Sequence, residues 1–163
     1  MAKTAKPIPE GHHTVTPYLV VKGAERAIDF YRRAFGAVEI CRMAGPEGKV
    51  LHAELQIGDS RIMLSDEYVE MGALSPRTIG GSSVTLLLYV PDVDESFRRA
   101  VGAGATSEMK PEDMFWGDRF GKLADPLGHR WSMATHKEDL TPEEIAKRQE
   151  KFFARRLQAA GKS

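Results

Sequence analysis

Residues 16–37 read TPYLVVKGAERAIDFYRRAFGA: a β-rich run, a glycine break, an amphipathic helical pattern and a second glycine. The pattern returns at residues 85–103 as TLLLYVPDVDESFRRAVGA. The strand parts align at an offset of 69 residues, whereas the helix endings YRRAFGA and FRRAVGA align at 66, so the second helix is one turn shorter. Such internal self-similarity predicts a duplicated structural unit.

Three further strand patterns follow each helix pattern, separated by Gly- and Pro-rich turns. In the first half they cover residues 38–43, 50–57 and 60–65, and in the second half 106–111, 114–123 and 129–135. The sequence therefore predicts an α+β fold in which two βαβββ modules form a cupped mixed sheet. The expected divisions are an N-terminal arm (1–13), a first module (14–66), a linker or lid (67–83), a second module (84–136) and a C-terminal helical tail (137–163).

The tail begins with a helix start signal. Thr141, Pro142 and Glu144 match a capping box with proline at the first helical position. An apolar stripe continues to about residue 160, which predicts a helix. The pattern leaves open whether this helix packs on its own domain or against a second subunit.

Composition narrows the class of partner and compartment. The 163 residues include 23 basic and 23 acidic ones, so charge gives no reason to expect nucleic acid or an anionic membrane as a partner. The single cysteine rules out an intrachain disulfide and fits a reducing compartment. There is no apolar run of about 20 residues and no signal-peptide pattern at the start, so we expect a cytoplasmic protein.

Strand alternation predicts which faces are buried. In residues 50–57, Leu51, Ala53, Leu55 and Ile57 share one face, and His52, Glu54 and Gln56 share the other. The helices should cover the apolar faces. The opposite faces are too polar for a dry core and predict a concave pocket. They carry Thr16, Tyr18, His52, Glu54, Met63, Ser65, Thr85, Tyr89 and Ser132.

His52 and Glu54 are the candidate catalytic residues, because a carboxylate two positions away on the same strand face can orient an imidazole base. The same pair could be part of a weak metal site, or a hydrogen-bonded pair that only shapes the cavity. Phe115, Trp116 and Arg119 lie on an expected strand and could stack a planar ligand and hold its anionic group, or pack in the core or an interface. The expected ligand contacts are Tyr18, Ser65, Tyr89, Phe115, Trp116 and Arg119.

The paired modules resemble the vicinal oxygen chelate superfamily, which includes glyoxalase I, the bleomycin- and fosfomycin-resistance proteins and extradiol dioxygenases. Over about residues 11–136 the chain is similar to the PhnB-like branch. The resemblance is carried by the stretches TPYLVVKGAERAIDFYRRAFGA, KVLHAELQIGDSRIMLSDE and WGDRFGKLADPLGHRWSMATH.

The resemblance implies where metal ligands should stand. The superfamily's metal enzymes carry His or Glu on the first and last strands of each module. The matching positions here are Thr16, Met63, Thr85 and Ser132, and none of these is a competent ligand for a divalent ion. We therefore expect a pocket with no metal and no cofactor.

The expected function is binding of a small organic molecule, as in the drug-sequestering members, by a homodimer, since dimers are common in the superfamily. The alternative is a glyoxalase-type lyase or isomerase that uses a relocated metal or acid–base chemistry by His52 and Glu54. A third possibility is a structural or regulatory subunit that acts through its C-terminal helix.

Overall fold

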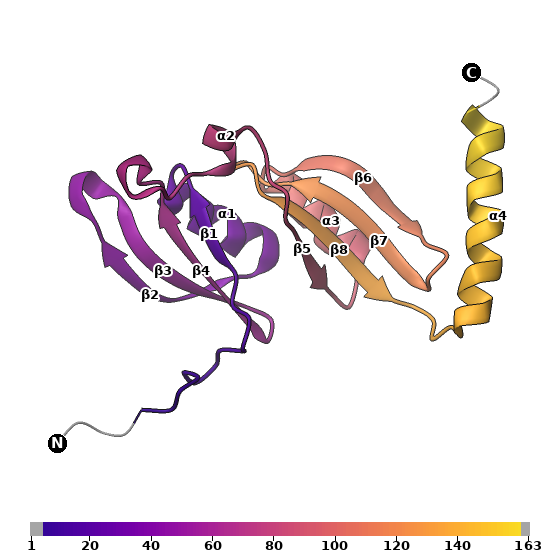
Figure 1. The fold of residues 1–163 in the computed structure, drawn as a ribbon, viewed down its shortest axis with the longest axis horizontal. Coiled ribbons are helices and arrows are strands. Elements are labelled where there is room, and N and C mark those ends of the chain that lie inside the picture. The colour runs from indigo at the N-terminus through magenta and orange to yellow at the C-terminus, as the bar shows by residue number, and fades with distance from the viewer. Residues whose placement is uncertain (1–4, 161–163) are drawn as a thin grey trace.

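The computed structural model describes residues 5–160, so the first four residues of the expected arm and the last three of the tail lie outside the described chain. Two four-stranded mixed sheets form the body (Figure 1). The first has the order β1-β4-β3-β2, with strands Tyr18–Val21, Ser60–Asp66, Val50–Ile57 and Val38–Ala44. The second has the order β5-β8-β7-β6, with strands Thr85–Tyr89, Arg130–His136, Asp118–Ala124 and Thr106–Asp113.

The strand register repeats the sequence offset. In the parallel pair β1–β4, Tyr18 lies beside Met63, and in the parallel pair β5–β8, Leu87 lies beside Ser132. Both residues of the second pair follow their counterparts by 69 positions. With the helices α1 (Ala24–Phe35) and α3 (Val93–Gly102), each half has the order βαβββ. The predicted duplication is confirmed.

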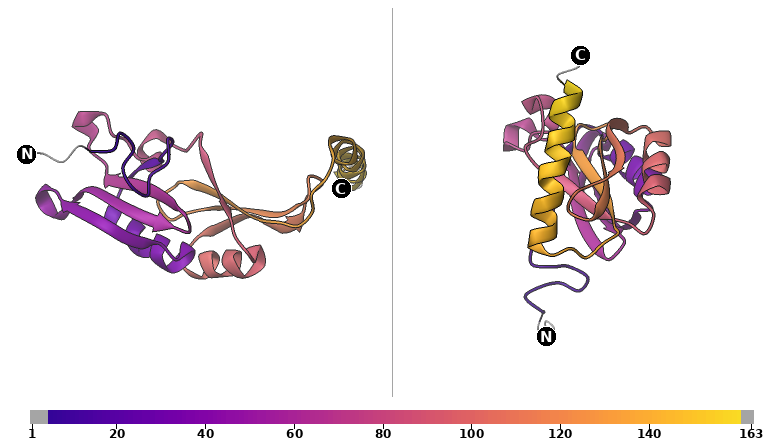
Figure 2. Two further views of the ribbon diagram at one scale, coloured as in Figure 1. Left: turned by 90° about the horizontal axis from the view of Figure 1, so that it is seen from below. Right: turned by 90° about the vertical axis from the view of Figure 1, so that its right-hand side faces the viewer.

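Both helices lie on the same side of the molecule, beneath their sheets (Figure 2). Their apolar stripes cover the faces that alternation predicted, and Tyr31, Leu55, Leu64, Leu123 and Trp131 are fully buried. The opposite faces carry the polar residues. We call the face of the β1–β4 sheet that points away from α1 the first polar face, and the face of the β5–β8 sheet that points away from α3 the second polar face.

Within residues 51–57 of β3, the burial differs from the predicted alternation at Leu51. Leu51 was expected on the buried face but is 42% exposed. The β2–β3 register shifts between the pairs Met43–His52 and Ala44–Val50, so Leu51 has no partner across the ladder. A bulge of this kind turns the extra residue out of the regular alternation.

The C-terminal helix α4 (Pro142–Ala160) projects from the end of the second module (Figure 1). The predicted capping box is present: the Thr141 backbone N–H donates to Glu144 Oε2 at 2.9 Å, and the Glu144 N–H donates to Thr141 Oγ1 at 3.3 Å. The helix contacts the turn between β6 and β7. The Phe152 and Phe115 rings lie 5.4 Å apart, and Arg156 pairs with Glu112 on β6.

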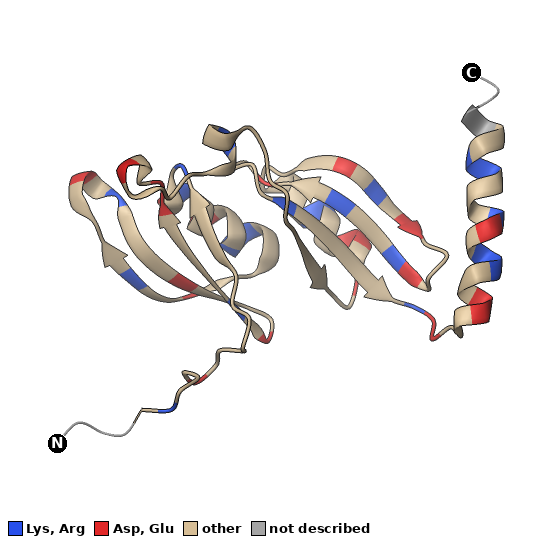
Figure 3. Cartoon of the chain, viewed as in Figure 1, with Lys and Arg blue, Asp and Glu red and all other residues tan. Residues whose placement is uncertain are grey.

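Residues 67–83 join the modules and contain two single turns of helix, Val69–Met71 and α2 (Pro76–Ile79). Basic and acidic residues are interspersed over the strands and helices (Figure 3). Among residues 5–160, no helix combines the length and the apolar character needed to cross a membrane.

Candidate functional site

Tyr18, His52 and Glu54 meet on the first polar face. The Tyr18 hydroxyl lies 3.1 Å from His52 Nδ1, and His52 Nε2 lies 3.6 Å from Glu54 Oε1. Adjacent strands place them there: β3 carries His52 and Glu54 two residues apart, and Met63 on β4 lies beside both Tyr18 and Glu54. The structure therefore brings together three of the residues predicted from sequence, and holds the imidazole between a hydroxyl and a carboxylate.

Two residues that the sequence analysis did not select complete this cluster. Arg61 on β4 donates from Nη1 to Glu54 Oε2 at 3.0 Å. His12, from the N-terminal arm, places Nε2 3.4 Å from the same carboxylate oxygen. Gly11 lies so close to Arg61 that a Cβ there would come within 2.8 Å of the guanidinium. The arm thus lies against the first polar face.

Cys41 joins the same cluster because of a bulge in β2. The register of β2 against β3 shifts between Glu39 and Cys41, so Cys41 pairs directly with Glu54. Regular alternation from Val38 would have placed Ile40 at that position. Ligand atoms of Cys41, His52 and Glu54 all lie within 4.8 Å of one another.

A second cluster forms on the second polar face around Asp118, which is buried. Its carboxylate accepts hydrogen bonds from the Tyr89 hydroxyl at 3.0 Å and from Trp116 Nε1 at 3.1 Å, and lies 2.7 Å from His136 Nδ1. The hydrogen bond to Asp118 raises the pKa of Tyr89. Hydrogen bonds to Asp139 and then to Asp118 raise the pKa of His136. Tyr89 and Trp116 are therefore brought together, but on the other sheet from His52.

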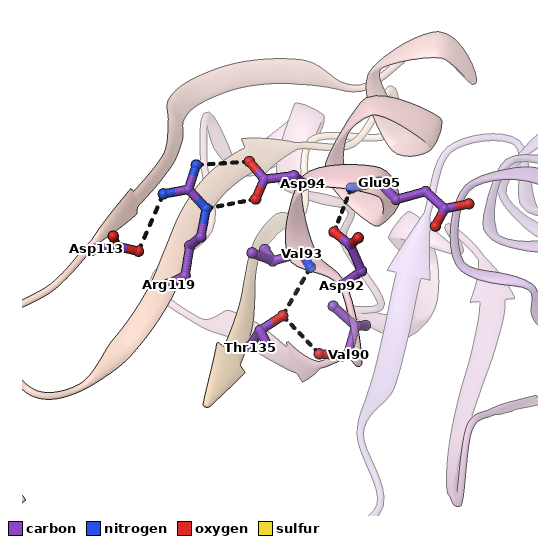
Figure 4. Close-up of polar contacts among 8 residues, drawn as sticks. All are labelled: Val90, Asp92, Val93, Asp94, Glu95, Asp113, Arg119 and Thr135. Atoms are coloured by element: carbon purple, nitrogen blue, oxygen red, sulfur yellow. Dashed lines mark hydrogen bonds and ion pairs between the residues drawn. The ribbon is translucent and has the colours of Figure 1, made fainter. Parts of the chain in front are cut away.

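Arg119 lies apart from both polar faces. It alternates with Asp118 along β7 and points to the helix side, where Nε and Nη2 donate to both carboxylate oxygens of Asp94 at 2.6 and 2.8 Å (Figure 4). Nη1 donates to Asp113 at 3.2 Å. These hydrogen bonds from Arg119 hold the pKa of Asp94 below its usual range. The guanidinium is thus committed to two carboxylates at the start of α3 and the end of β6.

Phe115 and Trp116 lie in the turn between β6 and β7, not on a strand as the sequence analysis expected. Their rings meet edge to face at 4.9 Å, and Phe115 also contacts α4. Glycine at 117 makes this turn possible, because its φ is +100° and a Cβ would lie 2.4 Å from the Glu138 carbonyl oxygen. Ser65, the remaining predicted contact, is buried in β4 beside Val20.

A groove of about 940 Å³ runs between the two modules. Ile62, Leu86 and Leu88 contribute apolar wall, and Arg61 and Tyr89 contribute polar groups at its edges. Ligand pockets in proteins usually measure about 300–1,000 Å³ and have mostly apolar linings with a few placed polar groups. Because Arg61 also binds Glu54, the groove adjoins the cluster on the first polar face.

The positions at which the family would hold a metal do not fit one here. Met63 lies between Tyr18 and Glu54, and Ser132 lies between Leu87 and Lys122. A thioether and a hydroxyl, with Thr16 and Thr85 at the other two positions, supply no imidazole, thiolate or carboxylate.

A comparison of the sequence with protein families agrees with the fold and the repeat. The profile of the glyoxalase/bleomycin resistance protein/dioxygenase superfamily matches residues 11–133. The chain belongs to this superfamily. The match covers both modules and ends within β8, so α4 lies outside the part that defines the superfamily.

Relatives within the superfamily are similar over the same region. An uncharacterized protein of Mycobacterium tuberculosis, Rv0887c, is 46% identical over 134 residues, which are 80% of this chain and 79% of that protein. The crystal structure of the Arabidopsis thaliana At5g48480 product is 30% identical with a TM-score of 0.62, covering 75% of this chain and 98% of that one. A PhnB protein from Bacillus cereus, at 20% identity, has a TM-score of 0.59 over 76% and 99% of the two chains and shows the same fold.

Sequence reasoning missed Arg61, Cys41, His12 and Asp118. Strand alternation puts Arg61 on the same face as Met63 in β4, and Asp118 on the same face as Phe120 in β7. Both residues could therefore have been assigned to the polar faces from the sequence. Cys41 carried none, because its place depends on the β2 bulge. His12 depends on how the arm folds back, which no local pattern specifies.

Proposed function

We propose that this superfamily member binds a small organic molecule in the groove between its modules, which Arg61 connects to the first polar face. The observation that carries the proposal is Arg61, which lines the groove and also holds Glu54. Its side chain is 20% exposed. The guanidinium carries five N–H donors, so those not used by Glu54 can donate to an acceptor oxygen on the ligand. The family's metal positions take no part.

A mass-spectrometric and NMR experiment tests this proposal. Native mass spectrometry of the full chain would detect a co-purifying molecule, and a fragment library of small carboxylates and aromatic rings would be screened by chemical-shift changes. We expect hits to shift residues of the groove, and Arg61→Gln to weaken them by about 10-fold or more. Arg32→Gln, on the exposed face of α1, is the control and should leave binding unchanged. Fragments that bind Arg61→Gln as tightly as the wild type, or the absence of any fragment that binds near the groove, would refute the proposal.

We further propose that the protein is a homodimer. Every residue of the edge strand β2 is exposed, and Val38, Ile40 and Met43 add apolar surface there. Unpaired edge strands and apolar surface are features that proteins commonly cover by association. Light scattering coupled to size-exclusion chromatography should give twice the chain mass. A monomer at micromolar concentration would contradict this proposal without affecting the groove.

Acid–base catalysis is the second candidate, and it is favoured by the contacts of His52. Tyr18 engages one ring nitrogen and Glu54 lies near the other, an arrangement that orients a general base. For any reaction found, His52→Gln should lower kcat by about 100-fold or more while the fold persists. An unchanged kcat would leave binding as the function.

A further inference from the structure

Cys41, His52 and Glu54 have the chemistry of a metal site. They offer a thiol, an imidazole and a carboxylate from two paired strands, and one ligand atom of each lies within 4.8 Å of the others. These are the three side-chain types that bind zinc in proteins. The site lies on β2 and β3 and uses none of the family's metal positions.

His12 provides an independent observation. Its side chain is only 8% exposed, and both ring nitrogens are buried without a hydrogen-bond partner within the described chain. A buried imidazole without partners is unfavourable. The His12 Nε2 atom lies 3.4 Å from Glu54 Oε2, beside the three ligand atoms but outside the group that they form, so an ion that drew the imidazole in would give it a partner.

The groups around the cluster already orient its ligand atoms. Tyr18 is hydrogen-bonded to His52 Nδ1, which leaves Nε2 for an ion. Arg61 binds Glu54 Oε2, which leaves Oε1. Outer partners of this kind fix the ring orientation and tautomer of metal-binding histidines. The two remaining atoms, His52 Nε2 and Glu54 Oε1, are 3.6 Å apart. Ligands at tetrahedral zinc lie about 3.3 Å apart, given bonds of about 2.0 Å.

We propose that Cys41, His52 and Glu54, with His12 as the fourth ligand, bind one zinc ion. A thiolate ligand favours zinc over magnesium or calcium, which prefer oxygen. One thiolate and one carboxylate would offset the charge of the ion, and Arg61 beside Glu54 leaves the site with one net positive charge. This inference departs from the expectation of a metal-free pocket and goes beyond the proposed function. Binding of zinc would fix the N-terminal arm to the first polar face through His12.

The test is a zinc titration of the full chain after chelation, under a phosphine reductant and in competition with a chromophoric chelator. We expect one zinc per chain. Cys41→Ser and His52→Ala should each weaken zinc binding by more than the roughly 10- to 100-fold caused by mutating residues that only hydrogen-bond to the metal ligands. His12→Ala should also weaken it, whereas His13→Ala, its exposed neighbour, should not.

Cobalt substitution separates loss of a ligand from loss of the fold. The wild-type cobalt protein should show a thiolate-to-cobalt charge-transfer band in the near ultraviolet. Cys41→Ser should lose this band while its far-ultraviolet circular dichroism is unchanged. Absence of saturable one-to-one zinc binding, or equal affinity in Cys41→Ser, would overturn the site. Equal affinity in His12→Ala would overturn the assignment of the fourth ligand.

The proposed zinc site and the proposed binding of an organic molecule can be refuted independently of each other. The fragment screen is repeated on chelated protein and on protein loaded with zinc. Zinc binding without any fragment hit would support the zinc site and count against the proposed function. Hits in the groove of a protein that takes up no zinc would support the function and overturn the zinc site.

Discussion

Asp66 and Thr135 hold the same place in the two modules, 69 residues apart, and each accepts a backbone N–H at the start of its module's helix. Asp66 Oδ1 accepts from Ala24 N at 2.9 Å, and Thr135 Oγ1 accepts from Val93 N at 2.8 Å (Figure 4). Val93 follows Ala24 by the same 69 residues. A residue at the end of the fourth strand therefore caps the helix in both halves, Asp66 as the last residue of β4 with a carboxylate and Thr135 as the residue before the last of β8 with a hydroxyl.

Removing these two caps should have unequal effects. Asp66 also accepts from Gly23 N and Val50 N, so Asp66→Ala leaves three backbone N–H groups without an acceptor. We expect a loss of about 3 kcal/mol in the free energy of unfolding, against about 1 kcal/mol for Thr135→Val. Urea denaturation measures both. Equal losses would show that the carboxylate adds nothing beyond a hydroxyl.

The buried carboxylate of Asp125 joins the modules. It accepts from the Tyr31 hydroxyl of α1 at 2.6 Å and from Trp131 Nε1 of β8 at 3.0 Å. Burial, and then the charge of Asp125, raise the pKa of Tyr31 well above its usual value, so the hydroxyl stays a donor. Tyr31→Phe should destabilise the fold by about 1–2 kcal/mol. The matched control is Tyr89→Phe, which removes a similar bond at an exposed position and should cost less. The reverse order in urea denaturation would contradict this account.

The stability of the C-terminal helix against local unfolding should depend on Phe115. This ring contacts both Phe152 and Phe153 of α4. Phe115→Ala should therefore speed amide hydrogen exchange in α4 while exchange in the sheets changes little, because none of residues 142–158 belongs to the hydrophobic core. Leu157→Ala, at a position 74% exposed, is the control. Unchanged protection of α4 in Phe115→Ala would show that another contact holds the helix.

His136 should make stability depend on pH. Its raised pKa comes from Asp139 first and Asp118 second. A group whose pKa is raised by folding stabilises the protein fully below its unfolded pKa, near 6.5, and loses that contribution as pH rises through the folded value. The stability difference between wild type and His136→Gln should thus shrink above about pH 6.5. In an NMR titration, Asp139→Asn should lower the pKa of His136, whereas Asp59→Asn should leave it unchanged.

The pairing of β2 with β3 shows which part of the candidate site could not be predicted from the sequence. Alternation along β3 correctly placed His52 and Glu54 on the face away from the helix. The observed pairs Val38–Gln56 and Glu39–Leu55, continued without a bulge, would place Ile40 opposite Glu54, but the bulge places Cys41 there. A bulge depends on how two strands fit together, so the sequence of one strand does not reveal it. For the same reason, Phe115 and Trp116 could not be assigned to a turn before the β6–β7 register was known.

The sequence by itself determined the duplicated βαβββ order, the helix ends and the division into apolar and polar faces. These follow from local periodicity and from glycine and capping residues, which act within a few positions of the chain. Only the tertiary structure decided which polar residues meet. Arg119 is bound by Asp94, Trp116 joins Asp118, and His12 folds back onto Glu54. Each of these contacts joins side chains whose meeting depends on turns, strand pairing or packing, and periodicity carries no information about such geometry.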